Sequence, residues 1–269
     1  MVQKSKVAAV VWFLVFLATE VSTAQILNVE KSRIDKDSAN TFFGNVSLNF
    51  NMFNRNSGND KPSTFLGFAA NSDLVYFSGK HSYYIIGNTN YVVLKRDPIV
   101  RTGYVHLRNN LYRRNRLSYE FFGQYQYDLG RRLDLRLLAG SGLRFAIHKS
   151  KEINLFVGSG LMLEHEEWDS PKPEEGILVV DLLKSSNYFS TRAHLNDNVE
   201  FNTITYYQVG YDQAISGFRQ RLSGDINFLF KINNKLRFRT NFNCTYDNRP
   251  IVPVTKFIYS LTNGVQANF

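Results

Sequence analysis

Residues 117–147 read LSYEFFGQYQYDLGRRLDLRLLAGSGLRFAI, and this stretch decides the fold. On both sides of Gly130, apolar or aromatic side chains recur at every second position. One set is Leu117, Tyr119, Phe121, Tyr125, Tyr127 and Leu129, and the other is Leu133, Leu135, Leu137, Ala139, Leu143, Phe145 and Ile147. The positions between them are mostly polar or glycine. A period of two is typical of a strand with one apolar and one polar face, so the stretch predicts two strands, 117–129 and 132–147.

The same alternation continues along the chain, and turn-forming clusters such as 148–152 and 232–235 interrupt it. We predict twelve strands, near residues 41–54, 63–77, 82–95, 101–112, 117–129, 132–147, 153–166, 188–195, 201–211, 219–230, 236–246 and 255–269. The pattern is broken in the second to fourth of these, so ten strands is the alternative. Residues 167–187 form the longest gap, and we expect an exposed loop there.

Long strands with one apolar and one polar face occur in soluble sandwiches and in transmembrane barrels. After residue 24 no apolar run reaches the roughly 18 residues that identify a membrane helix. An even strand number, aromatic residues near strand ends, such as Tyr125 and Tyr127, and short connections alternating with longer ones are typical of outer-membrane barrels. A closed barrel also leaves no exposed strand edge. We predict an all-β, transmembrane, antiparallel up-and-down β-barrel.

Both ends of the chain carry features of export. Lys4 and Lys6 precede an apolar run from Val7 to Ala18, which is shorter than the roughly 20 residues that span a bilayer. We expect a secretory signal peptide, 1–24, cleaved near Ala24, then a periplasmic lead-in, 25–40, and a barrel, 41–269. The last strand ends on Phe269 and resembles the C-terminal signal that the barrel-assembly machinery reads in bacterial outer-membrane proteins.

The net charge of the chain limits the kinds of partner that we expect it to bind. The formal net charge is +9, and removing Lys4, Lys6 and Glu20 with the leader leaves +9 − 2 + 1 = +8. An exported chain rarely meets nucleic acid, so the expected partners are outer-membrane lipid, the phosphates of lipopolysaccharide, and small ions or solutes. Cys244 is the only cysteine, which excludes an intramolecular disulfide.

Three segments resemble one known family. From QILNVEKSRI (25–34) through the 117–147 stretch to LEHEE (163–167), the chain is similar to the salt-induced outer-membrane protein family, whose domain has no assigned function. The most specific part of the resemblance is the central pattern of Glu120, Gln124, Arg136, Gly140, Gly142, Arg144 and Glu164. The resemblance implies an outer-membrane barrel of a Gram-negative envelope and no particular activity.

The predicted inward face carries the candidate site residues. Folding the two central strands about Gly130 places Gln124 opposite Arg136, and folding the next pair about Ser150 places Arg136 opposite Glu164. The candidates for an interior network or a constriction are Glu120, Gln124, Arg136, Arg144, Glu164 and Glu166. One interpretation is a charged constriction that selects ions or small solutes. The other is a network of ion pairs that fills the interior, because buried charges are usually paired.

Enzymatic and metal-binding alternatives have weaker support. His148 and Ser150 resemble the His-x-Ser arrangement of outer-membrane phospholipase A, but Lys151-Glu152 follows the serine where that family has Asn-Gly. In EHEE (164–167), alternation turns Glu164 and Glu166 inward and His165 outward, so these three do not converge on a metal. A calcium ion held by carboxylates at a loop edge is the remaining metal alternative.

We therefore expect no enzyme, metal or cofactor. The expected function is that of a porin-like small pore or an envelope-structural protein. A lipid-acting enzyme and a protein that binds ligands through its external loops are the alternatives.

Overall fold

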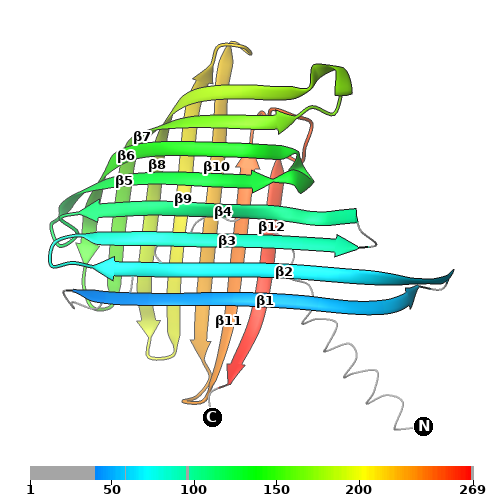
Figure 1. The fold of residues 1–269 in the computed structure, drawn as a ribbon. Coiled ribbons are helices and arrows are strands. Elements are labelled where there is room, and N and C mark those ends of the chain that lie inside the picture. The colour runs from blue at the N-terminus through cyan, green and yellow to red at the C-terminus, as the bar shows by residue number, and fades with distance from the viewer. Residues whose placement is uncertain (1–39, 58, 95–96, 268–269) are drawn as a thin grey trace, which may run out of the picture.

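The computed structural model describes residues 40–57, 59–94 and 97–267, which form one antiparallel sheet (Figure 1). The strands are hydrogen-bonded in chain order. They are β1 (Thr41–Ser57), β2 (Asn59–Phe77), β3 (Ser82–Leu94), β4 (Asp97–Leu111), β5 (Leu117–Asp128), β6 (Leu133–Lys149), β7 (Ile153–Asp169), β8 (Ile177–Asn196), β9 (Val199–Asp212), β10 (Gly217–Lys231), β11 (Leu236–Asp247) and β12 (Phe257–Ala267). The predicted twelve-stranded up-and-down arrangement is confirmed. The expected signal peptide (1–24), the lead-in up to residue 39 and Phe269 lie outside the described residues.

Helical structure is minimal in the described ranges. It consists of two 3-10 turns, η1 (Leu129–Arg131) and η2 (Pro173–Glu175). Within that part of the chain, no helix has the length and apolarity that crossing a membrane requires.

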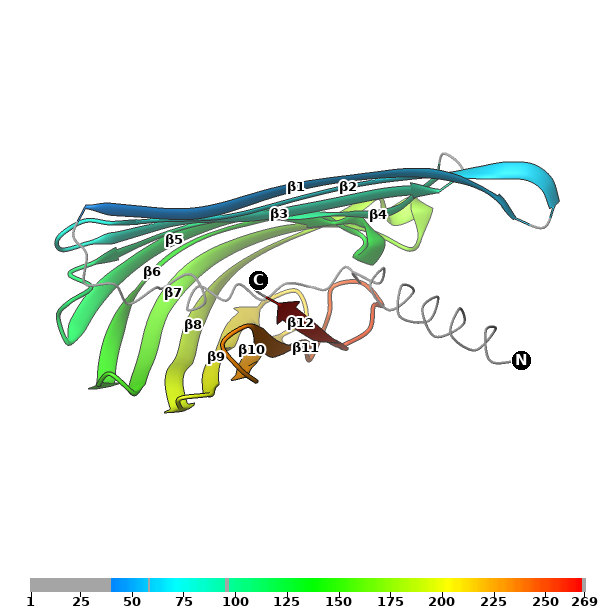
Figure 2. The same cartoon turned by 90° about the horizontal axis from the view of Figure 1, so that it is seen from below.

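The sheet is curled into a trough. In Figure 1, β1–β5 run across the view and β9–β12 run behind them at a steep angle. Seen from below, β5–β12 curve under the flatter β1–β4 (Figure 2). The right-handed twist between neighbouring strands accumulates into such curvature in a large sheet. β1 and β12 are the two edges of the described sheet, which is open between them and consistent with a barrel.

The two faces of the sheet have opposite chemistry, as the period of two predicts. On β5, Tyr119 and Phe121 are 45% and 51% exposed on the convex face. Their neighbours Ser118 and Glu120 are each only 3% exposed on the concave face. Every one of the twelve strands contributes large exposed apolar side chains in the same way, from Leu48 on β1 to Leu261 on β12. Apolar outside and polar inside is the reverse of a soluble protein.

Two predicted loops are wrong. Residues 177–187 belong to β8, so the loop after β7 spans only 170–176 rather than 167–187. The start of β8 shows no alternation because Leu182 is buried on the concave face while Ile177 and Leu183 are exposed on the other. Likewise, β1 and β2 continue to pair as far as Ser57 and Asn59, where a loop over 54–62 was expected. The sequence over 54–62 is polar at successive positions, so it shows no alternation there.

The connections alternate between the two ends of the trough. Residues 78–81, 112–116, 150–152, 197–198 and 232–235 lie at one end, called here the 112–116 end. The long β11–β12 connection lies at the opposite, 248–256 end. That connection folds inward, since Val252 is 1% exposed and packs in an apolar cluster with Leu133 and Trp168. The backbone N of Asn248 also donates to the carbonyl oxygen of Gln220 at 3.1 Å.

Candidate functional site

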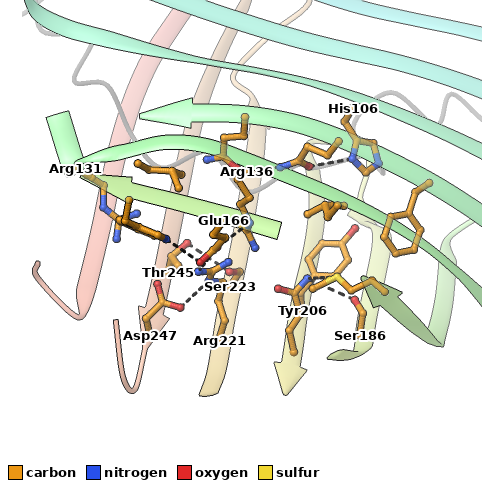
Figure 3. A pocket seen from close by; sticks show the side chains of 18 of the residues that line it. His106, Arg131, Arg136, Glu166, Ser186, Tyr206, Arg221, Ser223, Thr245 and Asp247 are labelled. Atoms are coloured by element: carbon orange, nitrogen blue, oxygen red, sulfur yellow. Dashed lines mark hydrogen bonds and ion pairs between the residues drawn. The ribbon is translucent and has the colours of Figure 1, made fainter. Parts of the chain in front are cut away.

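The principal pocket lies on the concave face and has a volume of about 830 Å³ (Figure 3). All strands from β4 to β11 contribute lining residues, and most of these are polar or charged. Those labelled in Figure 3 are His106, Arg131, Arg136, Glu166, Ser186, Tyr206, Arg221, Ser223, Thr245 and Asp247. Trp168 and Leu133, which pack on Val252, line its wall toward the 248–256 end.

The carboxylate of Glu164 on β7 is the centre of a charge network. Arg136 Nε on β6 donates to Glu164 Oε2 at 2.9 Å. Lys184 Nζ on β8 donates to Oε1, and Arg221 Nη1 on β10 lies 3.4 Å from Oε2. The Glu164 side chain is 1% exposed, so one buried carboxylate serves three cations. A carboxylate has enough acceptor positions for such an arrangement.

Two further carboxylates balance these cations. Glu166 Oε1 lies 3.1 Å from Arg136 Nε and 3.3 Å from Arg221 Nη2, and its Oε2 accepts from Trp168 Nε1 at 3.0 Å. Asp247 Oδ1 on β11 accepts from Arg221 Nε at 2.6 Å. We call the set Arg136, Glu164, Glu166, Lys184, Arg221 and Asp247 the Glu164 network. Its three cations and three anions cancel, which offsets the cost of burying them.

Glu120 on β5 forms a second group, called here the Glu120 cluster. Its carboxylate lies 3.7 Å from Arg108 Nη1 and 3.7 Å from Arg144 Nη1. The hydroxyl of Tyr188 donates to Glu120 Oε2 at 2.7 Å. The guanidinium of Arg108 lies 5.4 Å from the centroid of the Phe122 ring and 5.8 Å from that of Tyr188. Stacking of this kind lets aromatic rings share in stabilising a buried cation.

Glycines make room for these aromatic rings. Gly158 is the register partner of Tyr188, and Gly140 is the partner of Phe122. A Cβ atom on Gly158 would overlap the Tyr188 ring, and one on Gly140 would overlap Phe122. Gly140 and Gly158 therefore relieve crowding on the concave face.

The predicted strand registers are wrong by two residues. Gln124 is opposite Leu138 rather than Arg136, and Arg136 is opposite Glu166 rather than Glu164. The irregularity between Gln126 and Asp128 shifts the first pairing. The second differs because the β6–β7 turn is centred between Lys151 and Glu152 rather than on Ser150, so that Lys149 pairs with Asn154. Alternation alone reveals neither feature. The Arg136 side chain is long enough to contact both glutamates, so the expected contact with Glu164 is present.

The six candidates therefore divide among three places. Arg136, Glu164 and Glu166 belong to the Glu164 network, and Glu120 and Arg144 belong to the Glu120 cluster. Gln124 belongs to neither: its Oε1 lies 3.0 Å from His106 Nδ1, and its Nε2 donates to Gln126 at 2.9 Å. Folding about Ser150 would place Arg144 opposite Phe156, whereas the structure pairs it with Gly158. Its guanidinium nevertheless stacks 3.7 Å from the centroid of the Phe156 ring.

Three members of the Glu164 network were not among the candidates. Lys184 was missed because it lay inside the predicted 167–187 loop. The pair of Arg221 and Asp247 could have been found from the sequence, because folding the chain about Asn234 places these two residues opposite one another. The register of β10 and β11 confirms that pairing.

The residues considered for metal binding or for catalysis lie outside the Glu164 network and the Glu120 cluster. His165 points outward, with Nδ1 2.7 Å from Asp181 Oδ1 and Nε2 3.2 Å from Glu167 Oε1. Within the ranges that the structure describes, no three His, Cys, Asp or Glu side chains are grouped to hold a metal. Ser150 Oγ accepts from the backbone N of Glu152 at 3.2 Å and of Ile153 at 2.9 Å, so its hydroxyl is engaged in the β6–β7 turn.

Together, these features define an all-β protein with an apolar convex face and a buried, ion-paired concave face. Residues 52–256 match the family described as "Protein of unknown function, DUF481", so the chain belongs to that family. The resemblance to the salt-induced outer-membrane proteins agrees with this membership. No curated protein matches the sequence.

Proposed function

We propose that this protein is an outer-membrane β-barrel with an envelope-structural role, whose interior is closed by the Glu164 network. The observation that carries the membrane placement is the convex face. Leu48, Phe121, Leu163, Leu183 and Leu261 on five different strands are between 51% and 70% exposed. Monomeric soluble proteins rarely expose apolar patches larger than a few hundred Å². Hydrocarbon is the environment that such a surface requires.

The observation that carries the closed interior is the connectivity of the charges. The Glu164 network links β6, β7, β8, β10 and β11 across the trough. Val252 and Trp168 add an apolar seal toward the 248–256 end. Paired charges held this way support the sheet and leave little room for solutes. We propose that the protein is not an enzyme, and the engaged hydroxyl of Ser150 supports that view.

A narrow pore is the second candidate function, and the pocket of about 830 Å³ favours it. Arg136 and Glu164 would then be the charged ring that selects ions. The proposed partners in either case are outer-membrane lipid, lipopolysaccharide and the barrel-assembly machinery.

Conductance of the refolded protein in a planar bilayer separates the two functions. We expect the wild-type protein to insert without discrete current steps. Arg221→Ala, which removes the link between Asp247 and both glutamates, should open such steps. Arg132→Ala is the matched control, because Arg132 pairs with Asp169 at an exposed position, 45% and 57% accessible. Discrete steps from the wild-type protein would overturn the closed interior in favour of a pore.

Membrane location needs its own test. Fractionation of cells that express the full chain should recover the protein in the outer membrane, and washing with carbonate should not release it. A mature chain found soluble in the periplasm would overturn the membrane proposal.

A further inference from the structure

A second pocket lies at the 112–116 end, away from the Glu164 network. Its empty space, which is open to solvent, amounts to about 470 Å³. The cationic side chains of Arg113, from the β4–β5 turn, and of Arg144 and Lys149, from β6, line it. Arg116 also borders it, but its guanidinium lies 4.8 Å from the centroid of the exposed Phe145 ring. Phe77 and Phe156 form apolar walls. We call it the Arg113 pocket.

The charge of this pocket is one-sided. Among the described residues that line it, none is an aspartate or a glutamate. Glu120 lies 3.7 Å from Arg144, and Arg108 shares that carboxylate at the same distance. The described lining of this pocket carries cationic side chains and no anionic one, whereas the Glu164 network contains three of each. Like charges held together raise the local positive potential and favour an anion.

Arg113 also has donors in need of an acceptor. Its Nε and Nη2 atoms are buried, and neither has a hydrogen-bond partner in the described structure. The guanidinium lies 4.7 Å from the centroid of the Phe77 ring, which covers one of its faces. Leaving a charged donor buried without a hydrogen-bond acceptor is unfavourable, because the group has lost its hydration. An oxygen-rich anion in the pocket would remove that cost.

The cations are held in place before any ligand arrives. Lys149 Nζ donates to the carbonyl oxygens of Arg113, Arg114 and Asn115 at 3.3, 3.4 and 3.4 Å, which fixes the β4–β5 turn. The guanidinium of Arg144 stacks on Phe156, 3.7 Å from the ring centroid. A site whose donors are already ordered loses less entropy on binding.

We propose that the Arg113 pocket binds a phosphate group, presented either by a small phosphorylated solute or by a lipid headgroup. Guanidinium groups on two separate elements approach the cavity, the β4–β5 turn and β6, and such forks match the several oxygens of a phosphate. The apolar walls contact the organic part of the ligand. This site goes beyond the structural role and does not depend on it.

Calorimetry on the full chain in neutral detergent tests the site, with inorganic phosphate as the probe at constant ionic strength. The wild-type protein should bind phosphate saturably. Arg113→Gln should weaken binding about tenfold or more, since it removes charged hydrogen bonds. Lys235→Gln is the matched control: it removes one exposed cation from the 232–235 turn at the same end and should leave affinity unchanged. Thermal melts of the same samples identify any variant that has not folded.

Nanodiscs distinguish the two sources of phosphate. One set contains only zwitterionic lipid, and the other also contains phosphatidic acid, whose headgroup is a phosphate monoester. If phosphatidic acid blocks phosphate binding by the wild-type protein, the ligand is a headgroup. If phosphate binds equally well in both sets, the ligand is a solute. Absence of saturable binding in detergent and in both nanodiscs, or equal affinity of Arg113→Gln and the wild-type protein, would overturn the proposal.

Discussion

Arg221 and Asp247 are register partners on β10 and β11, and Arg221 Nε lies 2.6 Å from Asp247 Oδ1. The same guanidinium contacts Glu164 and Glu166 on β7 through its other nitrogens. One side chain thus joins a neighbouring strand to a strand across the trough. Contacts of this kind connect strands that are not neighbours in the sheet.

Removing Asp247 should weaken the fold measurably. In Asp247→Ala, Arg221 keeps two carboxylates but loses its shortest contact, so we expect the free energy of unfolding to fall by about 1–3 kcal/mol. Urea titration of the protein in detergent gives this value. Asp169→Ala removes the partner of Arg132 at an exposed position and should cost less than about 1 kcal/mol. Equal losses in the two variants would contradict a buried, cooperative network.

Glu164→Gln should shift ion selectivity toward anions when it is added to Arg221→Ala, the variant that we expect to conduct. It removes a carboxylate that Arg136 and Lys184 share, and so makes the charge of the interior less negative. The reversal potential in asymmetric chloride solutions measures this shift. A reversal potential equal to that of Arg221→Ala alone would show that ions do not pass Glu164.

Gly158→Ala should be destabilising because its Cβ would overlap the Tyr188 ring. Overpacking of this kind costs about 1–3 kcal/mol, and displacing the ring would also weaken the hydrogen bond from Tyr188 to Glu120. In a Tyr188→Ala background the same substitution should be close to neutral. Gly264→Ala on β12 is the strand control, since a Cβ there meets nothing within 4 Å.

The 170–176 loop should respond to acid. The pKa of Glu175 is lowered, first by its hydrogen bond with Lys172 and then by that with Ser170. A carboxyl with a depressed pKa in the folded loop stabilises it fully above the ordinary value of 4.5, and that contribution is lost as the pH falls through the depressed value. Carbon-13 NMR of the glutamate carboxyls should show Glu175 titrating below 4.5. Lys172→Gln should move its pKa upward, and an unchanged titration would contradict the hydrogen-bonded loop.

The sequence was most informative where alternation was clean. In β5, β6 and β7, the alternation of apolar and polar residues correctly predicted which side chains point inward. The two faces of such a strand lie in different environments, so every second residue has the same character. The start of β8 could not be predicted in this way. There Leu182 points inward and Leu183 outward, so apolar residues occupy both faces.

Register and long-range partners were harder to predict. An irregularity near Gln126 and a β6–β7 turn centred beyond Ser150 shift the two pairings by two residues without altering the alternation of the flanking strands. The contact of Arg221 with Glu164 joins residues that are far apart in the chain, and only the curvature of the sheet brings them together. The inward position of Val252 likewise depends on Trp168 and Leu133, which belong to other strands.

The position of Asp247 has a consequence for the order of assembly. A chain folded only as far as β10 would present Arg136, Lys184 and Arg221 against two carboxylates, Glu164 and Glu166. Adding β11 supplies the third carboxylate, Asp247, and the segment that follows places Val252 against Trp168. Docking of the β11–β12 hairpin therefore completes both the charge balance and the apolar cover of the concave face.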